Sequence, residues 1–233
     1  AMILAAGFGT RMGPITKLVP KPLIKINDKT LLEENIEKLA SIGVKEIIIN
    51  VSWLADKIIK RVGDGKSFGI KILWSKEDHP LDTGGGIYNV LPLLGEEPFF
   101  VANADVWVHT DAYKGLLDYY QSDMKGLLLM VKNPQHNKDG DFSLNDGLVG
   151  FGPSKLTFSG LSILSKSLFE HHNSSVAKFS LKDIFDFWIN KKKLSGLLYH
   201  GYWNDVGTPD RREMLEEYLS LIHISEPTRL VSI

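Results

Sequence analysis

A glycine-rich stretch near the start of the sequence carries residues that could bind an anion. The apolar residues Met2–Ala5 predict a short buried strand, and a loop of small residues, Ala6–Gly13, follows it. A strand that leads into such a loop exposes backbone N–H groups to an anion. Arg11 lies within the loop, and Lys21 follows it between two prolines. We therefore expect this stretch to bind phosphate groups, and several of them rather than one.

Two aspartates stand where a metal ion could join those phosphates. Asp105 follows the apolar run Phe99–Ala102, and Asp205 follows a short strand predicted at Tyr202–Trp203. Taken alone, each aspartate could equally cap a helix or hold a turn. At strand ends around a phosphate-binding loop they could hold Mg²⁺, which proteins usually bind through one or two carboxylates together with substrate phosphates.

Strand and helix patterns alternate through the first half of the chain. Thr30 is a plausible N-cap for a helix that stops at Gly43, and the β-branched run Glu46–Val51 predicts a buried strand. Further strands are expected at 70–74, 99–102 and 126–131, with helices at 53–62, 87–94 and 111–121. This order predicts an α/β fold with a mainly parallel sheet and helices on both faces. Such sheets bind ligands beyond the carboxyl ends of their strands.

The pattern changes from about Lys132. Residues 144–164 predict short strands that leave the main sheet as a hairpin and return to it. A helix at 180–190, strands at 196–199 and 202–203, and a helix at 210–219 follow. We expect a single domain over residues 1–219. Residues 220–233 are expected to be a tail foreign to this fold, because Ile222–Arg229 resembles translated adapter DNA.

Composition excludes several classes of protein. The 233 residues include no cysteine, which rules out disulfides, zinc–thiolate sites and thiol chemistry. The 27 Lys and Arg residues balance 28 Asp and Glu residues, which argues against a general nucleic-acid or membrane-surface binder. The apolar runs are too short for a membrane-spanning helix, and no basic and apolar leader is visible. A cytoplasmic protein with small-molecule substrates is expected.

Other motif-like patterns are weaker. Gly7–Met12 begins like a dinucleotide-binding G-x-G-x-x-G motif, but Met12 replaces the third glycine and no acidic residue follows a second strand at the required distance. Gly65-Lys66-Ser67 imitates the end of a P-loop without the earlier glycine. Thr83–Gly86 could be a plain turn, yet three glycines before a helix would let a flat ring approach closely.

The sequence resembles the sugar-1-phosphate nucleotidyltransferases, also called nucleoside-diphosphate-sugar pyrophosphorylases. Their opening pattern L-A-A-G-x-G-T-R-(M/L)-x-P-x-T, followed by P-K-P, is met at Leu4–Thr16 and Pro20–Pro22. The resemblance continues through Thr83–Gly86, Asn103–Asp105 and Trp203–Thr208. It implies a Rossmann-like three-layer sandwich with a mainly parallel, mixed sheet. No hexapeptide-repeat extension of the kind that makes related enzymes trimeric is visible, so a monomer is favoured.

The resemblance also implies roles for individual residues. Arg11 and Lys21 would be catalytic, by neutralising the phosphates and the leaving pyrophosphate. Asp105 and Asp205 would hold Mg²⁺. The nucleotide would be bound by Leu4, Ala5, Ala6, Gly7, Gly9, Thr10, Arg11, Lys21, Gly85 and Asn103. The sugar would be bound by Asp141, Ser159 and Gly160.

Within this family the chain looks most similar to the N-acetylmuramate α-1-phosphate uridylyltransferases of peptidoglycan recycling. The local matches include Asp82–Ile87, Asn103–Trp107, Gly140–Phe142 and Thr157–Gly160. This resemblance implies transfer of UMP from UTP to N-acetylmuramic acid α-1-phosphate, giving a UDP-sugar and pyrophosphate. The alternatives are a mannose-1-phosphate guanylyltransferase, a glucose-1-phosphate thymidylyl- or uridylyltransferase, and a non-catalytic sugar-nucleotide sensor on the same fold.

Overall fold

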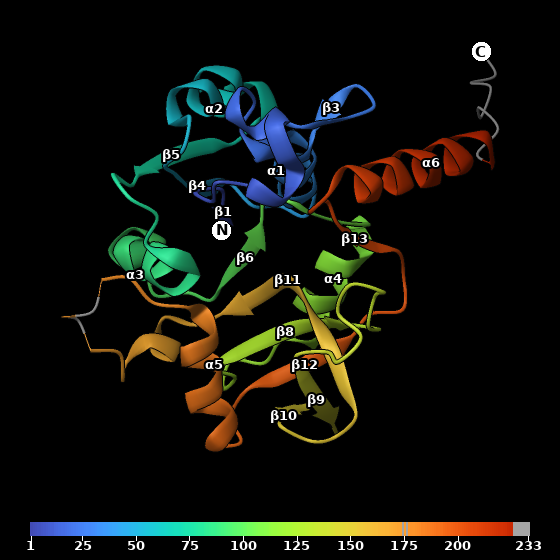
Figure 1. Cartoon of the computed structure of the whole chain (residues 1–233). Coiled ribbons are helices and arrows are strands. Elements are labelled where there is room, and N and C mark those ends of the chain that lie inside the picture. Colours follow the sequence, from blue (N-terminus) through green and yellow to red (C-terminus); the bar gives the residue numbers. More distant parts are fainter. Residues whose placement is uncertain (174, 176, 226–233) are drawn as a thin grey trace, which may run out of the picture.

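One large sheet organises the chain (Figure 1). The structure is a computed structural model, and it describes residues 1–173, 175 and 177–225. The strand order is β5-β4-β1-β6-β11-β8-β12-β10-β9. The bounds of these strands are β1 Met2–Leu4, β4 Glu46–Val51, β5 Lys71–Lys76, β6 Phe99–Asn103, β8 Gly126–Val131, β9 Phe142–Asn145, β10 Leu148–Gly150, β11 Lys155–Leu164 and β12 Ser195–Leu198. Two small antiparallel sheets pair β2 (Lys25–Ile26) with β3 (Lys29–Thr30), and β7 (Val106–Val108) with β13 (Trp203–Asp205).

Helices lie on both faces of the sheet, as predicted. They are α1 Leu31–Ser41, α2 Ala55–Val62, α3 Asp82–Leu94, α4 Thr110–Tyr119, α5 Leu181–Asn190 and α6 Pro209–Ser225, with short 3₁₀ helices at Thr10–Lys17, Lys21–Leu23, Lys66–Phe68 and Lys166–Phe169. The N-cap predicted at Thr30 is confirmed: its hydroxyl accepts a hydrogen bond from the Glu33 N–H, and the Glu33 carboxylate accepts one from the Thr30 N–H.

Successive residues of the central strands enter two different cores. Ile3, Ile47 and Ile49 pack with α1, α2 and α4 on one face, whereas Met2 and Ile48 pack with α3 and α5 on the other. Strands buried on both faces read as continuous apolar runs, which is why Glu46–Val51 shows no polar alternation.

The prediction of a mainly parallel sheet is right for one half only. Strands β5, β4, β1 and β6 are parallel, but β11 runs antiparallel to β6, β8 and β9. Because β9 also pairs with β10, and β10 with β12, the strands β11-β8-β12-β10-β9 close into a five-membered ring. The expected three-layer sandwich therefore ends in a small closed barrel, and the hairpin expected at 144–164 is part of that barrel.

Gly160 bends the long strand β11, which pairs with β6 in one half of the sheet and with β8 in the other. The register against β8 shifts between Phe158 and Ser162, and Gly160 has φ +86°. A Cβ on this glycine would lie 2.6 Å from Nδ2 of Asn103. Only glycine is free of strain with this backbone and this neighbour, so its position in the sequence sets where β11 turns.

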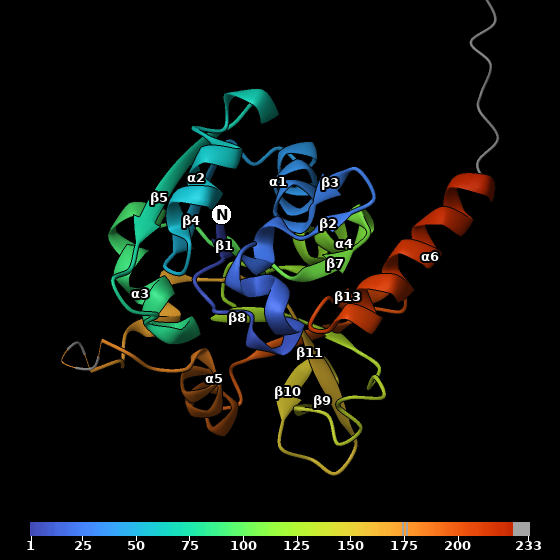
Figure 2. The same ribbon diagram turned by 45° about the horizontal axis from the view of Figure 1, so that its top comes forward.

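The C-terminal helix extends beyond its predicted end. Helix α6 begins at Pro209 and continues to Ser225, and it projects from one side of the molecule in both ribbon views (Figures 1 and 2). Its inner residues Leu215 and Leu219 pack with Trp107 and Val206. Residues 226–233, which include most of the predicted foreign tail, lie outside the described residues, so the boundary at 219 stays a prediction. No helix in the described part of the chain is long and apolar enough to cross a membrane.

Candidate active site

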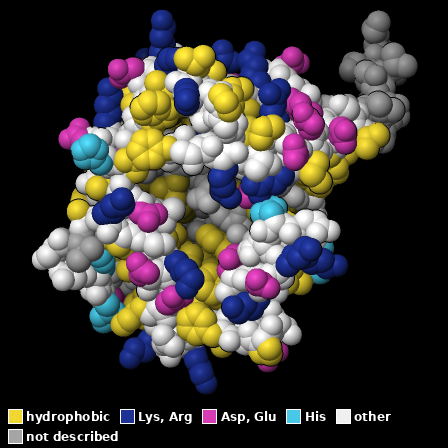
Figure 3. All heavy atoms as spheres, viewed as in Figure 1, with side chains coloured by type: hydrophobic (Ala, Val, Ile, Leu, Met, Phe, Trp, Pro, Cys, Tyr) yellow, Lys and Arg dark blue, Asp and Glu magenta, His cyan; other side chains and the backbone are white. Residues whose placement is uncertain are grey.

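The loop after β1 forms one wall of a cavity of about 470 Å³ at the carboxyl ends of β1 and β6. Ligand sites commonly fall within this range of volume. Figure 3 shows the corresponding face hollowed near its centre, with basic, acidic and apolar side chains around the hollow. All residues predicted to bind the nucleotide line this cavity except Gly85: Leu4, Ala5, Ala6, Gly7, Gly9, Thr10, Arg11, Lys21 and Asn103.

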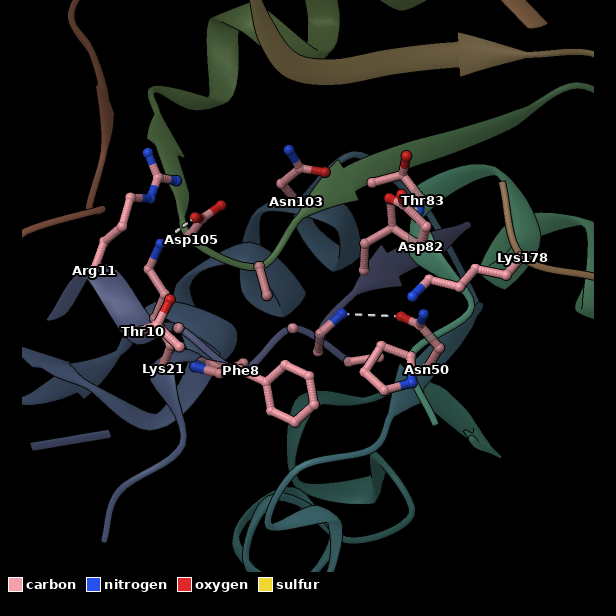
Figure 4. A pocket seen from close by; sticks show the side chains of 18 residues that line it. Phe8, Thr10, Arg11, Lys21, Asn50, Asp82, Thr83, Asn103, Asp105 and Lys178 are labelled. Atoms are coloured by element: carbon pink, nitrogen blue, oxygen red, sulfur yellow. Dashed lines mark hydrogen bonds and ion pairs between the residues drawn. The ribbon is translucent and has the colours of Figure 1, made fainter. Parts of the chain in front are cut away.

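Gly9 lets the loop pack directly on Lys21. Its φ is +66°, and a Cβ on Gly9 would lie 2.8 Å from Cβ of Lys21. Lys21 is only 8% exposed, and its ammonium forms an ion pair with the Asp105 carboxylate (Figure 4). The Arg11 guanidinium lies beside this pair. Gly9 therefore helps to position Lys21, and the ion pair of Lys21 with Asp105 joins the loop to the segment that follows β6.

A buried polar chain, missed by the sequence analysis, supports the loop from behind. Asn50 Oδ1 accepts a hydrogen bond from the Ala5 N–H at 2.9 Å, and Asn50 Nδ2 donates to Glu77 Oε1 at 2.8 Å. Glu77 Oε2 accepts from the Leu81 N–H at 2.9 Å. The side chains of both polar residues are buried, so these bonds hold the strand end and the start of α3 together. The sequence feature that could have indicated this chain is Asn50, a polar residue inside the apolar run 46–51.

The three glycines of Thr83–Gly86 contact protein groups, and they form the first turn of α3 rather than a loop before it. A Cβ on Gly84 would lie 2.4 Å from the Phe179 ring, and one on Gly85 would lie 2.3 Å from the Ala177 carbonyl oxygen. The Gly84 and Gly85 N–H groups both donate to the Phe179 carbonyl at 3.1 Å. Gly85 is thus buried beneath segment 177–181, away from the cavity, whereas Thr83 lines it.

Gly86 offers a direct test of this packing. We expect Gly86→Ala to lower the free energy of unfolding by about 2–3 kcal/mol, since its Cβ would lie 2.6 Å from Asn50 Nδ2 and 3.0 Å from Glu77 Oε1. Urea unfolding followed by tryptophan fluorescence would measure the change. Gly115→Ala is the matched control: it lies in α4, its Cβ would be 3.7 Å from Leu197, and it should gain up to about 1 kcal/mol. Equal stabilisation of both variants would contradict the proposed clash.

A second cavity of about 340 Å³ adjoins the first and shares Arg11, Asn103 and Asp105 with it. The three residues predicted for the sugar, Asp141, Ser159 and Gly160, and the predicted metal ligand Asp205 all line it. His136, Asn137, Thr157 and Trp203 also line it, although none of them was predicted as a site residue. The predicted site residues other than Gly85 are thus brought together around two neighbouring cavities.

Comparison with known proteins decides the family. Residues 1–143 match the nucleotidyl transferase family. The chain is 40% identical to N-acetylmuramate alpha-1-phosphate uridylyltransferase of Neisseria meningitidis, over 89% of this chain and 93% of that protein. The chain belongs to the nucleotidyl transferase family.

The chain is also similar, at lower sequence identity, to other known proteins. Mannose-1-phosphate guanyltransferase beta-B of Xenopus laevis is 31% identical over 99% of this chain and 67% of that protein. Among solved structures, HddC from Yersinia pseudotuberculosis superposes with a TM-score of 0.78 at 28% identity, covering 94% of this chain and 98% of that one.

In this nucleotidyltransferase, backbone pairing brings the segments that carry the two predicted metal ligands, Asp105 and Asp205, next to each other. The Val206 N–H donates to the Asp105 carbonyl at 2.9 Å, and Asp205 pairs with Val106 between β13 and β7. Among the described residues, no three His, Cys, Asp or Glu side chains gather closely enough to hold a metal ion by themselves. Two carboxylates on one cavity nevertheless fit Mg²⁺, which takes further oxygens from substrate phosphates.

Each of these carboxylates has a basic partner in the protein. Asp205 Oδ1 accepts from Arg211 Nη1 at 2.6 Å and lies 3.1 Å from His136 Nε2. Burial lowers the pKa of His136, so that at neutral pH its ring is mostly neutral. Asp141 differs, because its two oxygens accept from the Phe158 N–H at 2.8 Å and from Asn137 Nδ2 at 3.2 Å. Asp141 therefore fits a positioning or sugar-binding role better than a metal-binding one.

Proposed function

We propose that the protein transfers UMP from UTP to a sugar-1-phosphate, with N-acetylmuramic acid α-1-phosphate as the expected sugar, giving a UDP-sugar and pyrophosphate. We further propose that it does so in the cytoplasm, in peptidoglycan recycling. The observation that carries the proposal is the pair of adjoining cavities with Arg11, Asn103 and Asp105 on both. One cavity would take the nucleotide and the other the sugar, so that their phosphates meet at the shared residues.

The reaction needs no protein nucleophile, because a sugar phosphate is itself an anionic nucleophile. One of its oxygens attacks the α-phosphorus of the triphosphate, and pyrophosphate leaves in line. The obstacle is the repulsion between two polyanions, so positioning and electrostatic stabilisation supply most of the catalysis. Lys21 would lie between the two phosphates as a point charge, and the forked guanidinium of Arg11 would neutralise the outer phosphates and the leaving group.

Asp105 and Asp205 would hold Mg²⁺ at the junction of the two cavities. When bound there, the ion would offset phosphate charge that Arg11 and Lys21 leave uncompensated. The ion pairs that these carboxylates make with Lys21 and Arg211 keep their charge balanced before substrate arrives.

The second cavity has groups suited to a sugar. Asp141 is held rigidly by two hydrogen bonds, and Asn137 also donates to Thr157 at 3.1 Å. The Trp203 ring, which stacks on His136 with centroids 6.3 Å apart, offers an apolar surface to the C–H face of a hexose. These features support a sugar-sized ligand, and the 40% identity to the Neisseria enzyme is what supports N-acetylmuramic acid in particular.

A pyrophosphate-release assay tests the proposal. UTP, dTTP, GTP, CTP and ATP would each be combined with N-acetylmuramic acid, N-acetylglucosamine, glucose and mannose 1-phosphates, with and without Mg²⁺. We expect the highest kcat/KM for UTP with N-acetylmuramic acid 1-phosphate, and release only with Mg²⁺ present. Release solely from GTP with mannose 1-phosphate would favour a guanylyltransferase instead. Nucleotide binding without any turnover would favour the sensor.

A further inference from the structure

The first cavity has an end that none of the phosphate-binding residues reaches. Figure 4 shows Arg11, Lys21 and Asp105 on one side of the cavity, and Asp82, Thr83 and Lys178 on the opposite side. Leu4, Ala5, Ala6, Phe8 and Pro80 give the cavity an apolar wall, and Figure 4 shows Asn103 between its two sides. If the triphosphate occupies the cationic side, the base must extend along the apolar wall toward Asp82 and Lys178.

Asp82 is held in a strained conformation at this end. Its φ is +65°, a region that non-glycine residues adopt rarely and at a cost in free energy. One carboxylate oxygen accepts from the Thr83 N–H at 2.6 Å, and among the described residues the carboxylate has no other hydrogen-bond or ion-pair partner. Its second carboxylate oxygen is therefore available to accept a hydrogen bond from a ligand in the cavity.

Lys178 reaches the same end from a distant part of the chain. The Phe179 N–H donates to the Leu81 carbonyl at 3.3 Å, and the Leu181 N–H donates to the Thr83 hydroxyl at 2.9 Å. Together with the bonds from Gly84 and Gly85, these contacts fix segment 177–181 on the start of α3. Figure 4 shows the Lys178 side chain pointing into the cavity, and no partner for its ammonium is found among the described residues.

We infer that Asp82 and Lys178 read the edge of the base and select bases that carry a ring N–H beside a carbonyl oxygen. This inference rests on the proposed function. A carboxylate only accepts hydrogen bonds, and an ammonium group only donates them. Uracil, thymine and guanine present an N–H for Asp82 and a carbonyl oxygen for Lys178. Cytosine and adenine present a ring nitrogen acceptor beside an amino group, which is the opposite pattern.

Binding titrations without sugar phosphate test this inference. Calorimetry with Mg²⁺ would give Kd for UTP and for CTP with the wild-type protein, Asp82→Asn and Lys178→Met. We expect the wild-type protein to bind UTP more tightly than CTP. Each variant should lower the ratio of the Kd for CTP to the Kd for UTP by roughly tenfold, because hydrogen bonds to charged groups are among the stronger ones. Asparagine tolerates positive φ, so Asp82→Asn should keep the backbone conformation. Its amide N–H group adds a hydrogen-bond donor that can bind the ring nitrogen acceptor of cytosine.

Matched controls come from outside the cavity. Asp146→Asn changes another non-glycine residue with positive φ, 48°, in the turn between β9 and β10. Lys182→Met removes a lysine four residues beyond Lys178 that pairs with Asp186 at 2.6 Å. Both controls should keep the wild-type ratio of Kd values.

Three outcomes would overturn the inference. Equal weakening of UTP and CTP binding in the variants would assign Lys178 and Asp82 to the phosphates or to the fold. Wild-type Kd values for both nucleotides in the variants would remove the two residues from the base site. A wild-type protein that prefers CTP, or that binds neither nucleotide, would exclude the inference at once. A shifted ratio in a protein that releases no pyrophosphate would leave base reading intact and refute the proposed function alone.

Discussion

Lys21→Met is expected to lower kcat/KM at least about a hundredfold, which is about 2.7 kcal/mol of transition-state stabilisation. The side chain is buried on the wall of the first cavity and pairs with Asp105, which lines both cavities, so its charge acts in a medium less polar than water. Methionine keeps the length and apolar body of the side chain but leaves the meeting phosphates without their central cation. Steady-state pyrophosphate release over a range of both substrates would measure the effect.

The exposed residue Lys25, in β2, provides the control for this variant. Lys25→Met also removes one positive charge, but from a side chain on the surface and outside both cavities, and it should keep the wild-type rate. Loss of Lys21 also leaves Asp105 without its ion pair, so urea unfolding must show that the variant is folded. A folded Lys21→Met protein with wild-type kcat/KM would refute the catalytic assignment.

The opening motif could be interpreted from sequence because its chemistry is local. Strand, glycine loop and lysine lie within 22 consecutive residues, and each constrains the next: Gly9 must be small because Lys21 packs on it. Asp105 could be found for a similar reason, since it directly follows a recognisable buried strand. Residues whose position is set by their own segment are the ones that a single sequence can reveal.

Residues positioned by distant segments could not be found in this way. The five-membered ring depends on β11 pairing with β9, and no local pattern specifies which strands join. The glycines of Thr83–Gly86 look like a ligand-binding loop, but they accommodate Phe179, Ala177 and Asn50. Lys178 enters the cavity only because segment 177–181 docks on α3. For the glycines and for Lys178 the decisive contact spans tens of residues in sequence.

Asp105→Asn is expected to lower kcat at least about a hundredfold and to raise the Mg²⁺ concentration that gives half-maximal rate. An amide is a weaker ligand for a hard cation than a carboxylate, because it carries no charge. Asp205→Asn should act in the same direction. Pyrophosphate release at saturating substrates, measured across a Mg²⁺ titration, would give both quantities.

The metal role of Asp105 must be separated from its pairing with Lys21. If Asp105 only orients that lysine, Asp105→Asn would lower the rate at every Mg²⁺ concentration without shifting the half-maximal point, and the proposed metal site would be wrong. Asp141→Asn is the informative comparison, since both Asp141 oxygens are already engaged by Phe158 and Asn137. It should raise KM for the sugar phosphate while the Mg²⁺ dependence stays that of the wild type. A shift in Mg²⁺ dependence confined to Asp105 and Asp205 would distinguish carboxylates that hold the ion from one that holds the sugar.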